Sequence, residues 1–238
     1  MDDRRYFLLK RLHSLSGVIP VAGFVVFHLF ENSHSVEGQQ AFNHTVDVIR
    51  SQPYLSLLEL GLLAPIVFHA LMGLWLIRLG RQNVAQFPNR ANLSYALQRA
   101  TGVILLLFIS YHVWTTRFAD IPTNQMFQTL AANYAHPLVS AFYALGILSA
   151  AFHLSNGLWG FLVAWGMVSG EKSMEWAWKA CMGLGLVVAL MGLNALAGFH
   201  GKGVDVFNHH ESAPAAPSAS SGQALPTSST LPMSPTAH

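Results

Sequence analysis

The amino-acid sequence predicts an all-α integral membrane protein, in which four of five transmembrane helices form a bundle around buried histidines and the fifth completes the fold. Composition is the first observation: 52% of the 238 residues are hydrophobic and only 10% are charged, whereas soluble domains usually carry about 25% charged residues. The second is a set of five apolar segments, each near the length of about 20 residues that a helix needs to cross a bilayer. The third is a set of regularly spaced histidines inside those segments.

Five predicted spans follow in chain order, and the only charged residue inside them is Glu59. They are Leu12–Phe30, Leu55–Ile77, Ala100–Thr116, Pro137–Val168 and Ala180–His200. We interpret the first as a membrane helix and not as a cleaved signal peptide, because no small-x-small cleavage site follows Phe30. Pro20 and Pro65 lie inside spans, where membrane helices tolerate proline and can kink at it.

Positive charge gives the expected orientation. Lysine and arginine gather before the first span, between the second and third, and between the fourth and fifth; they are Arg4, Arg5, Lys10, Arg11, Arg78, Arg81, Arg90, Arg99, Lys172 and Lys179. Cytoplasmic loops of membrane proteins carry the excess of these residues. We therefore expect a cytoplasmic N-terminus and a C-terminus on the outside.

The chain is expected to divide into a membrane domain, residues 1–203, and a tail, residues 204–238. The tail is rich in Ser, Pro and Ala and has few large apolar side chains, which is typical of disorder. A net charge of +2 gives no argument for binding nucleic acid. Cys181 is the only cysteine, which excludes an intrachain disulfide and a Cys-ligated cluster.

Four histidines inside the spans form two pairs with a common offset. His28 and His112 are 84 positions apart, and so are His69 and His153. Their neighbours keep this register: Phe24, Phe27 and Phe30 correspond to Phe108, Tyr111 and Trp114, and Gly73-Leu74-Trp75 corresponds to Gly157-Leu158-Trp159. An ionisable group inside a membrane is costly and marks a functional site by default. An internal repeat that carries such histidines predicts two equivalent metal or cofactor sites.

The direction of each span places the two pairs at different depths. His28 and His112 fall in the outer half of the first and third spans, and His69 and His153 fall in the inner half of the second and fourth. In an up-down bundle the first and third helices are diagonal, as are the second and fourth. Two imidazoles that face each other across a bundle suit a bis-histidine haem, whose iron has no open coordination position and favours electron transfer. We therefore predict two haems stacked across the bilayer.

Other residues could accommodate or hold such a macrocycle. Gly73 and Gly157 each stand four residues after an inner histidine, on the same helical face. His13 and Ser16 begin the first span on the cytoplasmic side, and haem propionates need such donors. Arg78 and Arg99 at that surface are further candidate propionate contacts; positive-inside topology explains these two arginines equally well.

Glu59 lies about one turn into the second span from the outside. A carboxylate there could exchange protons with a quinone near the outer haem. It could equally be an interfacial side chain that reaches back to water.

Two simpler explanations of the histidines must be weighed. A single histidine in a membrane helix can merely hydrogen-bond a neighbouring helix, but this explains two equally spaced pairs less readily. Zinc would need tetrahedral ligands at one depth, and these histidines occupy two.

With these residues, the chain resembles the di-haem cytochrome b membrane-anchor subunits of B-type succinate:quinone oxidoreductases, which include succinate dehydrogenases and fumarate reductases. The resemblance covers about residues 4–200. It rests on Arg11-Leu12-His13 and Ser16-Gly17 at the start of the first span, one histidine in each of four consecutive spans, and a fifth span without a ligand.

The resemblance implies a proximal haem b on His69 and His153, near a cytoplasmic iron–sulfur subunit, and a distal haem b on His28 and His112. It also implies a flavoprotein subunit that oxidises succinate, a quinone, often menaquinone, that is reduced in the membrane, and a bacterial cytoplasmic membrane as location. The chain itself would carry no flavin and no succinate site. One departure is that Pro137–Gly170 has no carboxylate, so the glutamate proton route thought to operate in some fumarate reductases is not expected here.

Rival readings stay open at this point. Within electron transfer, the chain could be the cytochrome b subunit of a hydrogenase or formate dehydrogenase, or a b561-like ascorbate reductase. Outside it, the chain could be a haem-free carrier or channel whose histidines relay protons, or a purely structural anchor. Haem absorbance and the identity of the electron donor would separate these possibilities.

Overall fold

The computed structural model describes residues 2–80 and 83–206, and every regular element in these residues is a helix. Five helical segments are long and apolar enough to cross a membrane, which confirms the predicted all-α membrane fold. The elements are α1 Asp3–Ser16, η1 Gly17–Val21, α2 Ala22–Ser33, η2 His34–Glu37, α3 Gln39–Arg50, α4 Leu55–Leu79, α5 Arg90–Thr116, η3 Thr123–Gln125, α6 Met126–Tyr134, α7 Pro137–Ala164 and α8 Glu171–Gly198. Arg81 and residues 207–238, which hold most of the predicted tail, lie outside the described residues.

The helices differ in length from the predicted spans, most clearly at three of them, because hydropathy marks the apolar part of a helix and not its ends. The helix α5 begins ten residues before Ala100, where the Asn89 side chain accepts a hydrogen bond from the Asn92 N–H at 3.0 Å and caps the first turn. The helix α8 likewise begins before Ala180, at Glu171. The helix α7 ends four residues before Val168, and a turn with positive φ at two glycines leads into α8.

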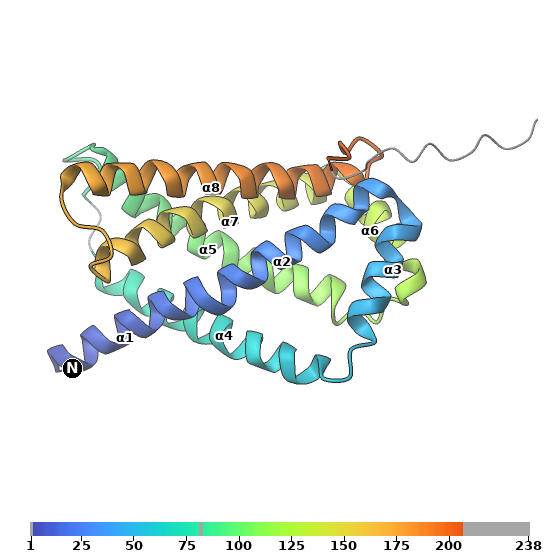
Figure 1. Ribbon diagram of the computed structural model, residues 1–238, viewed down its shortest axis with the longest axis horizontal. Helices are drawn as coiled ribbons and strands as arrows, with labels where there is room; N and C mark the ends of the chain where they lie inside the picture. The colour runs from blue at the N-terminus through green and yellow to red at the C-terminus, as the bar shows by residue number, and fades with distance from the viewer. Residues whose placement is uncertain (1, 81–82, 207–238) are drawn as a thin grey trace, which may run out of the picture. The chain divides into compact units, whose positions relative to one another are not determined.

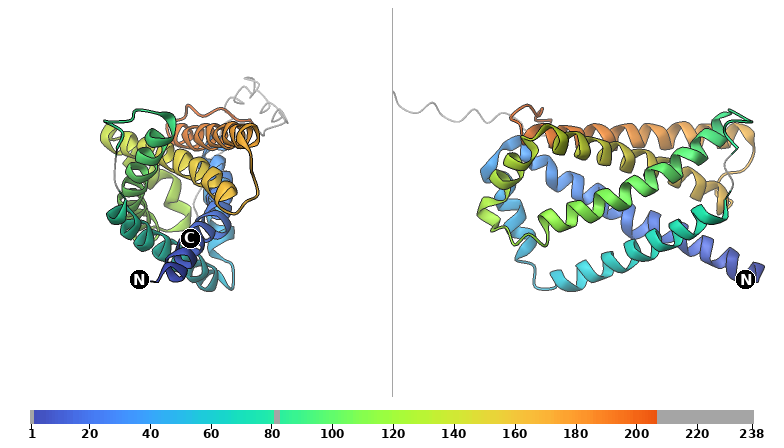
Figure 2. Two further views of the ribbon diagram at one scale, coloured as in Figure 1. Left: turned by 90° about the vertical axis from the view of Figure 1, so that its left-hand side faces the viewer. Right: turned by 180° about the vertical axis from the view of Figure 1, so that it is seen from behind.

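The long helices surround a common interior (Figures 1 and 2). The first span, α1 to α2, packs against α4, α7 and α8; α4 packs against α5, and α5 packs against α7. This order puts the first span diagonally opposite α5, and α4 diagonally opposite α7, as an up-down bundle requires. The first span crosses α4 near the end where the chain begins, and the two diverge toward the other end (Figures 1 and 2).

The fifth helix, α8, lies along α7 and the outer part of the first span (Figure 1). Small residues allow this close approach: a Cβ on Gly185 would meet Ser155 Oγ, and a Cβ on Gly192 would meet Ile147. Packing through small residues is usual between membrane helices. The helix α8 therefore supports the bundle without contributing a histidine to either pair.

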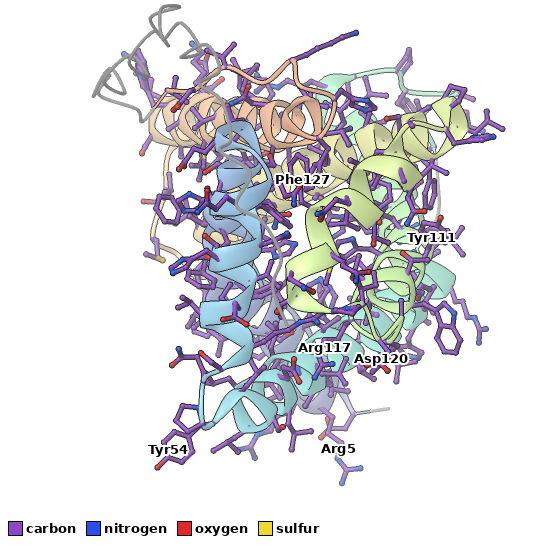
Figure 3. All side chains as sticks on the ribbon, turned by 90° about the vertical axis from the view of Figure 1, so that its right-hand side faces the viewer. Arg5, Tyr54, Tyr111, Arg117, Asp120 and Phe127 are labelled. Atoms are coloured by element: carbon purple, nitrogen blue, oxygen red, sulfur yellow. The ribbon has the colours of Figure 1, made fainter. Side chains whose placement is uncertain are left out.

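Two short helices that the sequence analysis did not predict, α3 and α6, cover the end of the bundle away from the N-terminus (Figure 3). Phe42 of α3 and Leu130 and Tyr134 of α6 are buried there against Phe199. The Asn43 side chain ties the layer together, because its Oδ1 accepts from the Phe127 N–H at 2.8 Å. Phe42 and Val46 lie four positions apart on α3, so the amphipathic pattern in this connection was the available signal.

The two prolines inside spans have different outcomes. Pro20 lies in η1, a π-helical segment in which the Ala22 N–H bonds to the Gly17 carbonyl five residues back. Pro65 lies inside α4, which remains one α-helix from Leu55 to Leu79. The first span is thus interrupted at its proline and the second is not.

Candidate cofactor sites

The inner histidines, His69 on α4 and His153 on α7, face each other across the bundle. Their ring centroids are 6.1 Å apart and their planes make an angle of 78°. A third histidine, His13 on α1, stacks on His69 with centroids 4.0 Å apart and an interplanar angle of 16°. Three imidazoles from three helices therefore meet at the inner site, where the sequence predicted two ligands and a nearby propionate contact.

Each inner histidine is held by the helix beside it in the same way. The Nδ1 of His69 lies 3.0 Å from the carbonyl oxygen of His13 and 3.3 Å from Ser16 Oγ. The Nδ1 of His153 lies 3.1 Å from the carbonyl oxygen of Gln98 and 3.2 Å from Thr101 Oγ1. A carbonyl can only accept, so each Nδ1 carries the proton and each Nε2 keeps its lone pair, which is the tautomer that ligates a metal through Nε2.

Glycines on the neighbouring helices leave room for the rings of the inner histidines. A Cβ on Gly17 would lie 2.5 Å from Cε1 of His69, and a Cβ on Gly102 would lie 3.1 Å from Cε1 of His153. Of the two predicted glycines, Gly73 lies beside His13, with its virtual Cβ 3.4 Å from that ring. Gly157 lines a hollow of about 310 Å³ between α5 and α7, together with Ser94, Tyr95, Gln98, Asn156 and Trp159.

The outer histidines, His28 on α2 and His112 on α5, also face each other, with ring centroids 5.7 Å apart and an interplanar angle of 72°. Each stacks on the phenylalanine one turn before it: Phe24 is 5.2 Å from His28, and Phe108 is 5.8 Å from His112, centroid to centroid. The phenylalanines of the sequence repeat therefore lie against the histidines of the same repeat.

Side chains, and not carbonyls, hold the outer rings. The Tyr143 hydroxyl lies 3.3 Å from Nδ1 of His112. The Asn32 amide lies 3.3 Å from Nδ1 of His28 and donates to the His28 carbonyl at 2.7 Å. Tyr143 is buried and its hydroxyl also bonds to Tyr134 and Thr115.

Both pairs have a spacing at which two imidazoles could hold one metal-bearing group between them. Two in-line metal–imidazole bonds of roughly 2 Å each put two ring centroids about 6 Å apart, and the observed separations are 5.7 and 6.1 Å. The angles of 72° and 78° between the ring planes are compatible with two imidazoles on one metal, since two rings can share one axis at any rotation about it. Within residues 2–80 and 83–206, no group of three His, Cys, Asp or Glu side chains, His13 with the inner pair included, is arranged so that it could hold a metal ion by itself.

Three of the other predicted contact residues lie at the inner end of the bundle. Ser16 lies at the inner site, as described. Arg99 is at the same end, where its Nη2 donates to the Leu76 carbonyl at 3.1 Å and its guanidinium lies over the Tyr95 ring. Arg78 is exposed in the last turn of α4.

Glu59 lies at the opposite end and is engaged in an ion pair. Its two carboxylate oxygens accept from Arg117 Nε and Nη2 at 2.6 and 3.1 Å, joining the start of α4 to the end of α5. This hydrogen bonding raises the pKa of the Arg117 guanidinium. In this arrangement Glu59 links two helices.

Several residues of these sites were missed by sequence reasoning, namely Asn32, Gln98, Thr101, Gly102 and Tyr143. The available signal was a second hydroxyl–glycine pair: Ser16-Gly17 in the first span is matched by Thr101-Gly102 in the third. Gln98 contributes a backbone carbonyl, and a carbonyl leaves no mark in a sequence.

Comparison with known proteins gives a consistent result. Residues 81–193 match the family described as succinate dehydrogenase/fumarate reductase transmembrane subunit. The chain is similar to the succinate dehydrogenase cytochrome b558 subunit of Bacillus subtilis (strain 168), with 35% identity over 201 residues, covering 84% of this chain and 100% of that protein. It is also similar to the succinate dehydrogenase hydrophobic membrane anchor subunit of Halobacterium salinarum, with 38% identity over 65 residues, or 27% of this chain and 49% of the relative. Together with the five membrane-length helices, these matches show that the chain belongs to the family of transmembrane subunits of succinate dehydrogenases and fumarate reductases.

Proposed function

We propose that this chain is a di-haem cytochrome b anchor that passes electrons between a cytoplasmic iron–sulfur subunit and a quinone in the membrane. The observation that carries the proposal is the geometry of the two histidine pairs: each comes from diagonal helices and has its rings about as far apart as two axial ligands of one metal. The name of the Bacillus subtilis relative, a cytochrome b558 subunit, supports haem b as the cofactor.

The chain's residues have distinct roles in this proposal. His69 and His153 hold the proximal haem, and His28 and His112 hold the distal haem. Haem held by two histidines in this way would supply one-electron chemistry and would favour electron transfer over oxygen binding. The carbonyls of His13 and Gln98 fix the tautomer and the direction of the inner ligands, so that Nε2 points into the bundle.

The inner end is the end that we assign to the cytoplasm. The lysine and arginine residues of α1, of the last turn of α4 and of the first halves of α5 and α8 lie there, in accord with the positive-inside rule. The iron–sulfur subunit, with the flavoprotein behind it, would dock at this end in the cytoplasmic membrane of a bacterium. His13, Ser16 and Arg99 would then be the contacts of the haem propionates, and Arg78 is exposed in the last turn of α4.

The quinone, for which menaquinone is our first choice, would react nearer the outer pair. Glu59 is the only carboxylate on the spans between Leu55 and Ala164, and it would exchange the protons. In the structure the Glu59 carboxylate is paired with the Arg117 guanidinium. A neutral glutamine at this position would retain size and hydrogen bonding but could carry no proton.

The test is to purify the chain with its membrane partners and to record a dithionite-reduced minus oxidised spectrum, with a pyridine haemochrome count. We expect two haems b per chain, reducible by succinate or reoxidised by fumarate. Two haems that respond to neither would retain the cofactor but assign the chain to another electron-transfer complex. The absence of haem would overturn the proposal and leave proton relay or packing as the role of the histidines.

A further inference from the structure

The inner ends of the first and third spans correspond at an offset of 85 positions, not 84. The carbonyls of His13 and Gln98 hold the two inner histidines. The hydroxyls of Ser16 and Thr101 approach the Nδ1 atoms of the same two rings. Gly17 and Gly102, which have no Cβ, leave room for the Cε1 atoms of these rings. These three correspondences share the offset of 85.

The outer ends of the same two spans correspond at 84. Phe24 matches Phe108, and each stacks on the histidine four residues later. The stretch from Gly17 to Phe24 therefore takes seven residue steps, whereas the equivalent stretch from Gly102 to Phe108 takes six. The first span contains one more residue than the third between its inner and outer sites.

An extra residue in a regular α-helix turns everything beyond it by about 100°, since a turn has 3.6 residues. The extra residue here falls within η1, Gly17–Val21, which is π-helical, whereas the equivalent part of α5 is α-helical. A π-bulge is a way for a helix to absorb one added residue. Pro20 favours the departure at this place, because it cannot donate to the carbonyl four residues back and its ring clashes with it.

From these observations we infer that the π-helical segment 17–21 is a positioning element, an added residue that lets one membrane span serve both histidine pairs. It keeps the His13 carbonyl, Ser16 and Gly17 facing His69 while His28 faces His112. Without it, only one end of the span could be in register. The inference rests on the proposed function insofar as both pairs hold haem.

The test removes one residue from the segment. Ile19 is 65% exposed, so deleting it removes little packing inside the bundle. If the outer half of the span then keeps its place, Ser16 takes the place of Gly17 and its Cβ meets His69. If the inner half keeps its place, His28 turns away from His112. In either case we expect one haem per chain in place of two, and two haems in the length-preserving control Ile19→Ala.

A rescue variant separates register from damage to the fold. Inserting an alanine between Val21 and Ala22 of the Ile19-deleted chain restores seven steps between Gly17 and Phe24, and we expect the second haem to return. A deletion chain that keeps two haems, or a folded rescue chain that holds only one, would overturn the inference.

Crosslinking gives a readout that needs no haem. In a Cys181→Ala background, Ser14→Cys with Trp165→Cys reports on the inner half of the span, because Trp165 Nε1 donates to Ser14 Oγ at 3.2 Å. Leu29→Cys with Ala189→Cys reports on the outer half, since Leu29 packs against the buried cluster of Ala151, Val188 and Ala189. A short bis-maleimide should link both pairs in the full-length chain, one in the deletion chain and both after rescue. If the full-length chain holds no haem, the proposed function fails and these links alone decide the inference; both links persisting after deletion would refute it.

Discussion

The inner and outer histidine pairs look alike in sequence but are held differently. His69 and His153 rest on backbone carbonyls of neighbouring helices at 3.0 and 3.1 Å. His112 rests on the hydroxyl of Tyr143 at 3.3 Å, and His28 on Asn32 of its own helix. A carbonyl in a helix is fixed once the helix packs, whereas a side-chain partner must itself be ordered. The inner site is therefore preorganised by the fold, and the outer site by particular side chains.

The surroundings of the two sites show the same contrast between backbone packing and side-chain contacts. At the inner site a glycine of each neighbouring helix lets the ring lie against the backbone, and η1 packs on α4. Around the outer site α4 is less enclosed, with Leu57, Leu58 and Leu60 each more than 60% exposed. The Glu59–Arg117 ion pair ties it to α5 there. We expect backbone changes to damage the inner site most, and side-chain changes to damage the outer site most.

The largest effect is expected from removing a ligand. His69→Ala should abolish the inner haem alone and His28→Ala the outer haem alone, because each pair is built on separate helices. The haem-to-protein ratio should fall from two to one in each variant, and each should lose a different part of the reduced-minus-oxidised spectrum. Loss of both haems from either single variant would show that the sites are not independent.

Gly17→Ala tests the fit of backbone against ring at the inner site. The added Cβ would lie 2.5 Å from His69 Cε1, and such overpacking typically costs about 1–3 kcal/mol. We expect loss or strong perturbation of the inner haem, and a milder effect of Gly102→Ala, whose Cβ would lie 3.1 Å from His153. Gly23→Ala is the control on the same span, since nothing lies within 4 Å of its Cβ. Equal behaviour of the variants at positions 17 and 23 would contradict the close fit.

The contrast between backbone and side-chain partners also explains which features of the fold and the sites could be predicted from the sequence. Composition and the 84-residue offset predict the membrane fold, the five long helices and the pairing of four histidines, because hydropathy and spacing are properties of the sequence. The carbonyl of Gln98 and the π-helical form of Gly17–Val21 could not be predicted, since they depend on how helices pack. The covering helices α3 and α6 could have been found from their amphipathic pattern, as with Phe42 and Val46.

Tyr143→Phe and Thr101→Val compare the two ways of holding a histidine. The first removes the hydroxyl beside His112 Nδ1, whereas the second leaves His153 with its bond to the Gln98 carbonyl. Loss of such an outer-shell partner typically costs 10–100-fold in metal affinity, so we expect Tyr143→Phe to weaken retention of the outer haem by about that factor. Thr101→Val should cost about 1 kcal/mol at most. Haem transfer to apomyoglobin measures both, and a larger loss in Thr101→Val would invert the comparison.

Tyr134 gives the outer end of the bundle a pH dependence of stability. Burial, reinforced by the neighbouring Tyr143, raises the pKa of the Tyr134 phenol well above its usual value. A raised folded-state pKa contributes stability that is present below the unfolded pKa of about 10 and is lost as pH rises beyond it. Thermal unfolding in detergent should therefore show a falling Tm from pH 9 to 11, with a shallower fall in Tyr134→Phe. An unchanged slope would mean that another group dominates the alkaline loss.

The smallest expected effect concerns the ion pair that joins α4 to α5. The Glu59 and Arg117 side chains are 38% and 50% exposed, and exposed ion pairs are typically worth about 0–1 kcal/mol. A double-mutant cycle with Glu59→Gln and Arg117→Gln should give a coupling energy in that range that shrinks with added salt. Quinone reduction separates the two residues: if Glu59 transfers protons, Glu59→Gln slows turnover while Arg117→Gln, which leaves the carboxylate in place, does not. Equal slowing in both variants would assign the ion pair to helix packing and remove Glu59 from the proton path.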